Sequence, residues 1–156
     1  RIATAVGQRH LPHALAVLFT VAGTPAVYAG DEYGFDAVKT ERIGGDDAVR
    51  PAFPATPEEV EETDAARDAL RLTRDLVAFR RRRPWLHSAR TDVVETTNLT
   101  LVIRTAVDDE AAIVALNIGD DEAVAAAAGA GQLALGTGVL ADARVVLPPH
   151  GWVILT

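Results

Sequence analysis

The sequence contains no cysteine and no methionine, and aromatic residues make up only 5% of it. The absence of cysteine excludes disulfide bonds and thiolate metal sites. Because there is no methionine anywhere, we expect that Arg1 is not a natural start, so the N-terminus gives no information about secretion. No run of about 18 apolar residues is present, which argues against a membrane span. A membrane partner is therefore not expected.

Basic residues are scarce in the C-terminal part of the chain. Residues 1–90 carry 13 basic and 13 acidic side chains, whereas residues 91–156 carry 2 basic and 9 acidic ones and so account for the whole formal charge of −7. An acidic surface repels nucleic acid, so no nucleic-acid partner is expected. The change in charge near residue 90 also predicts a domain boundary close to that point.

The first part of the chain predicts a helix, a strand and a long loop. Apolar residues recur at helical spacing over 10–22, where Pro12 suits the first turn and Gly23 ends the helix. A short β-capable run follows over 25–29. Residues 30–55 then form a loop rich in Gly, Asp and Pro, and loops of this length inside a domain are usually functional or disordered.

A second helix is expected over 64–83, where apolar residues step by three and four positions until Pro84 ends the pattern. Thr56–Glu59 has the residue types of a capping box and marks an earlier helix start.

After Trp85 the hydrophobic period changes from 3.6 to 2 residues. Runs rich in Val, Ile, Leu, Thr and Ala alternate with turn signals made of Asn, Asp, Gly and Pro. The predicted strands cover 91–96, 99–106, 111–118, 122–128, 144–147 and 151–156. Several short strands at such spacing predict an antiparallel β-sandwich.

The stretch Gly23–Gly34 reads Gly-Thr-Pro-Ala-Val-Tyr-Ala-Gly-Asp-Glu-Tyr-Gly. A helix, a buried strand and then carboxylates at the strand's C-terminal end is the layout of a β/α unit whose upper rim carries chemistry. The segment is similar to the last barrel strand of the α-amylase superfamily, glycoside hydrolase family 13, whose pattern is close to G-x-P-x-x-Y-x-G-D-E-x-G.

Three further segments are similar to the same family. The residues from Leu76 to Leu86 match its L-x-x-L-R-R-x-x-P-x-L stretch. Arg1 resembles the arginine that follows the family's N-H-D signature, and Arg50 resembles the start of its R-x-P-M-x-W segment. In that last segment Ala52 and Phe53 stand where methionine is expected and the tryptophan is missing, so a tryptophan sugar platform does not carry over.

The resemblance implies an α+β fragment in which residues 1–86 form the last elements of a (β/α)8 barrel and residues 87–156 form a C-terminal β-sandwich. It also implies that the parent protein is a retaining α-glucosidic-bond hydrolase or transglycosidase acting on α-glucans or maltooligosaccharides. The family's three catalytic carboxylates would lie before Arg1, so we expect no catalytic residue in this chain and no activity from the chain alone.

The predicted substrate-binding residues are Asp31, Glu32 and Arg50. Adjacent residues of a strand point to opposite faces, so Asp31 and Glu32 can share a pocket only if the chain has already turned. The alternative is that one of them holds the loop by hydrogen bonds. Arg50 could contact sugar hydroxyls, pair with Glu32, or lie solvated in the loop.

No cofactor and no metal are expected. His10 and His13 lie three residues apart, but no third ligand is close in sequence, so a solvated helix end is the simpler interpretation. The alternative function is a non-catalytic carbohydrate-binding or structural sandwich module, which exposed aromatic side chains would favour. We also expect the isolated chain to self-associate, because barrel elements without neighbours leave strand edges and apolar faces open.

Overall fold

The computed structural model describes residues 1–60 and 63–156. The chain divides into two compact units, Arg1–Ala14 with Ala26–Asp75 and Leu15–Pro25 with Leu76–Thr156. Each unit is described on its own. The domain boundary expected after residue 86 stays a prediction.

The two longer α-helices form where the hydrophobic period of 3.6 residues predicts them. The α-helices are α1 (Ile2–Val6), α2 (Leu11–Thr20), α3 (Pro57–Val60) and α4 (Asp64–Arg81). The 3-10 turns are η1 (Gln8–His10), η2 (Asp31–Tyr33), η3 (Asp47–Val49) and η4 (Pro84–His87). The two helices expected over 10–22 and 64–83 are thus confirmed as α2 and α4, each a few residues shorter than expected.

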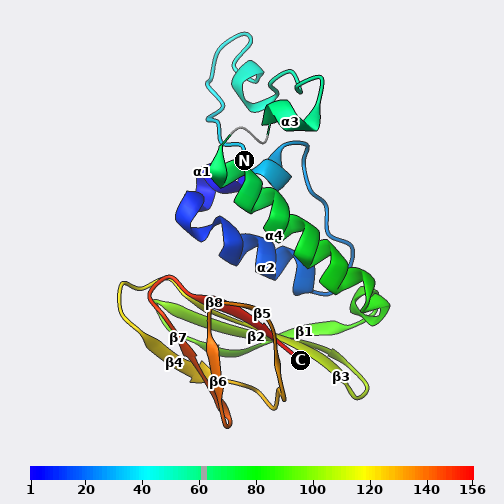
Figure 1. The fold of residues 1–156 in the computed structure, drawn as a ribbon, viewed down its shortest axis with the longest axis vertical. Helices are drawn as coiled ribbons and strands as arrows, with labels where there is room; N and C mark the ends of the chain where they lie inside the picture. The colour runs from blue at the N-terminus through cyan, green and yellow to red at the C-terminus, as the bar shows by residue number, and fades with distance from the viewer. Residues whose placement is uncertain (61–62) are drawn as a thin grey trace. The chain divides into compact units, whose positions relative to one another are not determined.

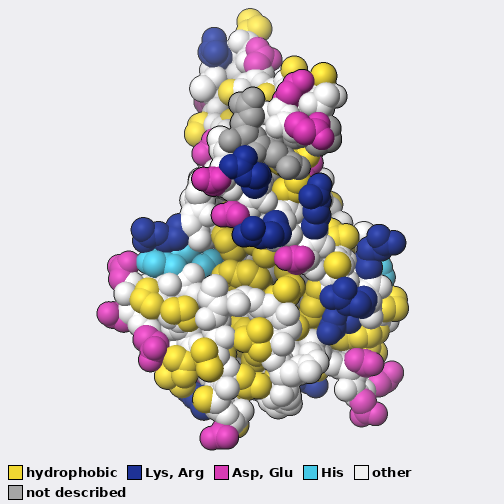
Figure 2. Space-filling view, in the orientation of Figure 1, with side chains coloured by type: hydrophobic (Ala, Val, Ile, Leu, Met, Phe, Trp, Pro, Cys, Tyr) yellow, Lys and Arg dark blue, Asp and Glu magenta, His cyan; other side chains and the backbone are white. Residues whose placement is uncertain are grey.

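Helix α4 begins with a side-chain cap and carries a charged outer face. The Oγ1 of Thr63 accepts the backbone N–H of Ala66 at 3.1 Å, which satisfies one of the free donors at the helix start. Figure 2 shows basic and acidic side chains interspersed over the region where this helix lies in Figure 1. Arg71 and Asp68 form an ion pair on the helix at 2.9 Å. Exposed pairs of this kind add little stability, so α4 is held mainly by its buried apolar face.

Residues 25–29, expected as a strand, run without β-ladder hydrogen bonds. The expectation of a strand here is wrong for a physical reason. A parallel strand needs hydrogen-bonded neighbours on both sides, and the described residues supply none. The side chains of Val27 and Tyr28 are 38% and 53% exposed, so the segment is also not buried as a barrel strand would be.

The expected antiparallel β-sandwich is confirmed in the second unit (Figure 1). One sheet has the strand order β1-β2-β3-β8-β5 and the other β4-β7-β6, with every pairing antiparallel. The strands are β1 (Arg90–Thr96), β2 (Thr100–Val107), β3 (Glu110–Asn117), β4 (Ala123–Ala126), β5 (Leu133–Gly136), β6 (Val139–Ala141), β7 (Arg144–Leu147) and β8 (Trp152–Leu155).

The sandwich core is closed by aliphatic side chains from both sheets. Val102, Ile113 and Val153 of the larger sheet form one buried cluster with Val145 and Leu147 of the smaller one, all at most 1% exposed. Strands β3 and β8 are buried almost continuously rather than at alternate residues, so both faces of this part of the sheet are covered. The sandwich therefore has a self-contained core.

Strands β5 and β6 were not predicted, because glycines around them read as a turn. Gly136 has φ +113°, and a Cβ on it would lie 2.3 Å from the carbonyl oxygen of Trp152 on the neighbouring strand. A glycine in a strand can thus mark the close approach of two backbones. Trp152 itself is 9% exposed, so it packs in the sandwich and offers no stacking surface.

A buried arginine in the second unit completes the end of helix α2. The guanidinium of Arg80 donates hydrogen bonds to the carbonyls of Phe19 and Val21, both at 2.9 Å, and also to that of Gly23. The last carbonyls of a helix have no partner within it, so Arg80 acts as a C-terminal cap. Burial lowers the pKa of Arg80, because removal from water disfavours the charged form of its guanidinium.

Replacing Arg80 with alanine should therefore destabilise the chain. Arg80→Ala leaves three carbonyls without their donor, and we expect the free energy of unfolding to fall by about 3 kcal/mol. Arg81→Ala, at an exposed neighbour, is the matched control and should cost within about 0.5 kcal/mol. Urea denaturation followed by circular dichroism measures both. Equal effects of the two variants would contradict the capping role.

Candidate active-site pocket

The acidic motif lies on a tight turn that reverses the chain directly after residues 25–29. Gly30 has φ +95°, and a Cβ on it would lie 2.4 Å from the ring of Phe35. Residues Asp31–Tyr33 then form the 3-10 turn η2. The chain has therefore already turned when the two carboxylates occur, so they are not constrained to opposite faces of a strand.

The carboxylate of Asp31 is buried against the guanidinium of Arg1. The Nη1 of Arg1 donates to Asp31 Oδ1 at 3.0 Å and to the carbonyl of Ala29 at 2.6 Å. Its Nη2 donates to the carbonyl of Val49 at 2.9 Å. The two side chains are only 3% and 7% exposed. Asp31 thus fixes the position of the Arg1 side chain. The guanidinium of Arg1 in turn hydrogen-bonds to two loop segments that are far apart in the sequence.

Glu32 is used locally. Its Oε2 accepts the backbone N–H of Gly30 at 2.7 Å. Such a hydrogen bond from a side chain to a nearby backbone group stabilises a turn. The sequence left open that one of the two carboxylates holds the loop by hydrogen bonds. In the structure both carboxylates accept hydrogen bonds from this part of the chain.

Asp46, in the same long loop, lies between two cationic side chains. Its carboxylate oxygens are 3.0 Å from the Nζ of Lys39 and 3.1 Å from an Nη of Arg50. The hydrogen bond and charge of Lys39, with a smaller contribution from Arg50, hold the pKa of Asp46 below its ordinary value. Arg50 therefore pairs with Asp46, and the pairing with Glu32 considered from the sequence is not observed.

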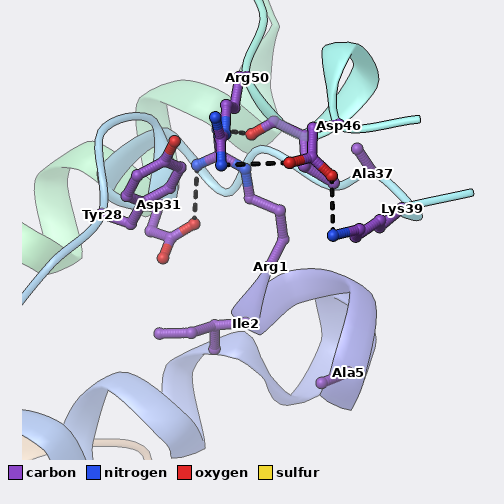
Figure 3. A pocket seen from close by; sticks show the side chains of 10 residues that line it. Arg1, Ile2, Ala5, Tyr28, Asp31, Ala37, Lys39, Asp46 and Arg50 are labelled. Carbon is purple, nitrogen blue, oxygen red and sulfur yellow. Dashed lines mark hydrogen bonds and ion pairs between the residues drawn. The ribbon is translucent and has the colours of Figure 1, made fainter. Parts of the chain in front are cut away.

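These groups surround one open pocket of about 690 Å³ (Figure 3). Its walls combine apolar and charged side chains from three segments of the first unit. They are Arg1, Ile2, Ala5, Tyr28, Asp31, Ala37, Lys39, Asp46, Val49 and Arg50. The ring of Tyr28 has the guanidinium of Arg1 4.6 Å from its centroid and remains half exposed. A pocket with a few fixed polar groups and an aromatic wall is the usual form of a small-ligand site.

The structure brings two of the three predicted residues to this pocket. Asp31 and Arg50 line it, whereas Glu32 does not belong to its wall. Lys39 and Asp46 were missed by sequence reasoning, because their pairing depends on how the long loop folds. Tyr28 could have been found, since it belongs to the motif that defines the segment.

Among the described residues, no group of three histidines and carboxylates is placed to hold a metal ion. The rings of His10 and His13 meet edge to face, with centroids 5.0 Å apart. Within the same described part of the chain, no helix combines the length and the apolar character needed to cross a bilayer.

Three solved structures illustrate what the whole chain is similar to. A debranching enzyme from Nostoc punctiforme, soaked with acarbose, is 22% identical, with a TM-score of 0.75 over 99% of this chain and 31% of that one. AmyP in complex with maltose is 17% identical, with a TM-score of 0.75 over 95% of this chain and 34% of that one. The ligand-free cyclic α-maltosyl-(1→6)-maltose hydrolase from Arthrobacter globiformis is 27% identical, with a TM-score of 0.70 over 99% and 31%.

The chain therefore spans about a third of the length of the structures it resembles. Neither the protein-family models nor the curated protein sequences gave a match to it. By its fold, the chain is an α+β arrangement of helices and an antiparallel β-sandwich, similar to about a third of each of these much larger chains. The similarities confirm the resemblance to the C-terminal portion of the α-amylase superfamily, glycoside hydrolase family 13, that the sequence motifs indicated.

Breaking the buried pair should cost far more stability than breaking the exposed one. Asp31→Asn leaves the Arg1 guanidinium buried without its counter-charge, and we expect a loss of about 3 kcal/mol in the free energy of unfolding. Asp46→Asn is the matched control in the same pocket, where the ion-pair partners are exposed and the loss should be much smaller. Chemical denaturation of both variants measures the two losses in the free energy of unfolding. Similar losses would show that the ion pair of Arg1 with Asp31 does not hold the loop.

Proposed function

We propose that this chain is the C-terminal part of a retaining α-glucosidic-bond hydrolase or transglycosidase that acts on α-glucans or maltooligosaccharides. The observation that carries the proposal is the meeting of three motif positions, Arg1, Asp31 and Arg50, at one pocket. The likeness to a debranching enzyme and a maltosyl hydrolase supports it at the level of substrate class.

Within that proposal the three predicted residues have different roles. Arg50 contacts substrate, because its side chain is 66% exposed and a guanidinium can donate to two neighbouring sugar hydroxyls at once. Asp31 positions Arg1 and so acts through it. Glu32 keeps the turn in shape from outside the wall of the pocket.

The catalytic carboxylates come from elsewhere in the parent enzyme. A retaining glycosidase needs two carboxyl groups about 5 Å apart, one of them a general acid with a raised pKa. Asp46 has its pKa lowered by Lys39 and Arg50, which is the opposite of what a general acid requires. Asp31 is committed to Arg1 by a buried ion pair.

The alternative, a carbohydrate-binding or structural sandwich module, has less support. Sugar-binding modules present exposed aromatic rings as stacking surfaces. The sandwich offers Trp152, which is buried at 9% exposure. The self-association expected of the isolated chain stays a prediction, and the exposed side chains of Val27 and Tyr28 are consistent with it.

The 156-residue chain alone should release no reducing sugar from maltooligosaccharides, because no pair of carboxylates in its described part, residues 1–60 and 63–156, is positioned as acid and nucleophile. A reducing-sugar assay at high protein concentration measures this. Turnover that disappears in Asp31→Asn or Asp46→Asn would contradict the proposal, because it would place the catalytic groups in this pocket.

In the parent enzyme, Arg50→Ala should lower kcat/KM by about 10- to 100-fold, since a lost charged hydrogen bond costs about 1.5–3 kcal/mol. The melting temperature should stay close to that of the wild type, because Arg50 forms only an exposed ion pair. Arg42→Ala is the matched control, an exposed arginine of the same loop outside the pocket wall. If both variants retained full kcat/KM, the substrate role of Arg50 would be excluded.

A further inference from the structure

A cavity of about 470 Å³ lies within the second unit, and the function proposed above does not use it. Its wall combines residues from the end of helix α2, the segment after that helix, the last turns of helix α4 and the turn η4. The apolar side chains of this wall are Phe19, Pro25, Val77 and Pro84. The cavity therefore offers apolar surface to the body of a small ligand.

The polar side chains of the same wall are all neutral or basic. They are Thr24, Arg80, Arg81 and His87, and no aspartate or glutamate occurs among the described residues that line the cavity. The chain as a whole has a formal charge of −7, so a wall without any carboxylate departs from its average composition. An anion in this cavity would be attracted by the basic groups and would meet no carboxylate in the wall.

Arg80 brings a buried positive charge to the wall. The residue is only 8% exposed, and its guanidinium donates to the carbonyls of Phe19, Val21 and Gly23. These carbonyls occupy its N–H groups but carry no net negative charge, unlike the carboxylate of Asp31 that faces Arg1. Burial lowers the pKa of Arg80, because its charged form has lost water. A bound anion would supply the counter-charge that the neutral carbonyls do not.

Arg81 and His87 provide groups that can contact an anion directly. Arg81 is exposed in the last turn of α4, and no carboxylate within residues 1–60 and 63–156 forms an ion pair with it. The Nδ1 of His87 lies 3.4 Å from the Oγ1 of Thr24, so the second ring nitrogen, Nε2, remains for a ligand. A guanidinium can donate two parallel hydrogen bonds to one carboxylate, which makes Arg81 the main anchor.

We propose that this cavity binds a small monocarboxylate with an apolar body, its carboxylate held by Arg81 and His87 and its body packed against Phe19 and Val77. The apolar surface disfavours a strongly hydrated anion such as inorganic phosphate, because that anion would lose water without gaining polar partners. The site does not depend on the proposed function. It is built by the second unit and shares no lining residue with the pocket of Figure 3.

The test is a titration of the full 156-residue chain with 4-phenylbutyrate, followed by ¹H–¹⁵N correlation NMR. We expect saturable chemical-shift changes at residues 19, 24, 77 and 81. Arg81→Ala should weaken the binding by about tenfold or more, because the carboxylate loses its charged hydrogen bonds. Arg82→Ala is the matched control and should leave the affinity unchanged, since Arg82 is the next exposed arginine and lies outside the cavity wall.

Two further ligands separate the contributions of charge and apolar surface. The amide 4-phenylbutyramide keeps the apolar body but has no charge, whereas inorganic phosphate has charge but no apolar body. Each should bind about tenfold more weakly than 4-phenylbutyrate, or less. Unliganded spectra of both arginine variants should keep the dispersion of the wild type, so that a loss of binding is not a loss of folding.

Each outcome bears on the proposal in a defined way. Saturable shifts at residues 19, 24, 77 and 81 that Arg81→Ala weakens, and that Arg82→Ala leaves unchanged, support it. Equal affinity for the amide would show that charge is not recognised, and equal affinity for phosphate would show that the apolar surface is not used. Either result overturns the proposal. Shifts only at other residues, no shift at all, or equal weakening by the two arginine variants overturns it as well.

Discussion

The buried guanidinium of Arg1 is the constraint on which the candidate pocket depends. It joins three stretches of chain that are far apart in sequence, through Asp31, the carbonyl of Ala29 and the carbonyl of Val49. A charge this well buried is tolerated only when it is paired, and the two Nη atoms of Arg1 meet Asp31 and two carbonyls. The loop must therefore fold so that these acceptors meet Arg1, and the pocket is a consequence of that arrangement.

A second arginine solves a related problem in the other unit. Residues 21–30 belong to neither helix nor sheet, so their backbone groups lack the partners that regular structure supplies. Arg80 donates to carbonyls at positions 19, 21 and 23, and Arg1 donates to the one at 29. An arginine can do this because its fork carries five donors and it stays charged when buried. Lysine carries its three N–H donors on one nitrogen, so it lacks the planar fork that reaches carbonyls lying apart from one another.

Sequence periodicity predicted the fold well where the structure is local or self-contained. Helices α2 and α4 and most strands of the sandwich follow from hydrophobic spacing, because each element buries one face against partners within this chain. Residues 25–29 have the composition of a strand but no ladder partner among the described residues, and composition alone cannot report on partners. Strands β5 and β6 were missed because the glycines of this region, Gly136 among them, have the composition of a turn. Gly136 instead lets the backbone of β5 approach that of Trp152 closely.

Asp31 and Arg50, which the motifs singled out, line one pocket, but the roles of these residues depend on contacts that no motif contains. Adjacent carboxylates at positions 31 and 32 suggested a pair aimed at substrate, yet each accepts hydrogen bonds from this chain. Arg1 was noted for its family likeness alone, since nothing in sequence indicates a partner thirty residues away. Lys39 and Asp46 meet through the fold of a long loop, and such ion pairs leave no periodic signal.

The balance of charge in the pocket also limits what it can bind. Arg1 is matched by Asp31, and Lys39 and Arg50 are matched by Asp46, so most of the positive charge is already compensated. A phosphate or carboxylate ligand would have to compete with these carboxylates for the same cations. A neutral polyhydroxyl ligand need not displace either ion pair, because it can add hydrogen bonds to exposed groups such as Arg50 while Asp46 stays in place. The same electrostatics that make this pocket unsuitable for acid catalysis therefore support the sugar-binding role proposed for it.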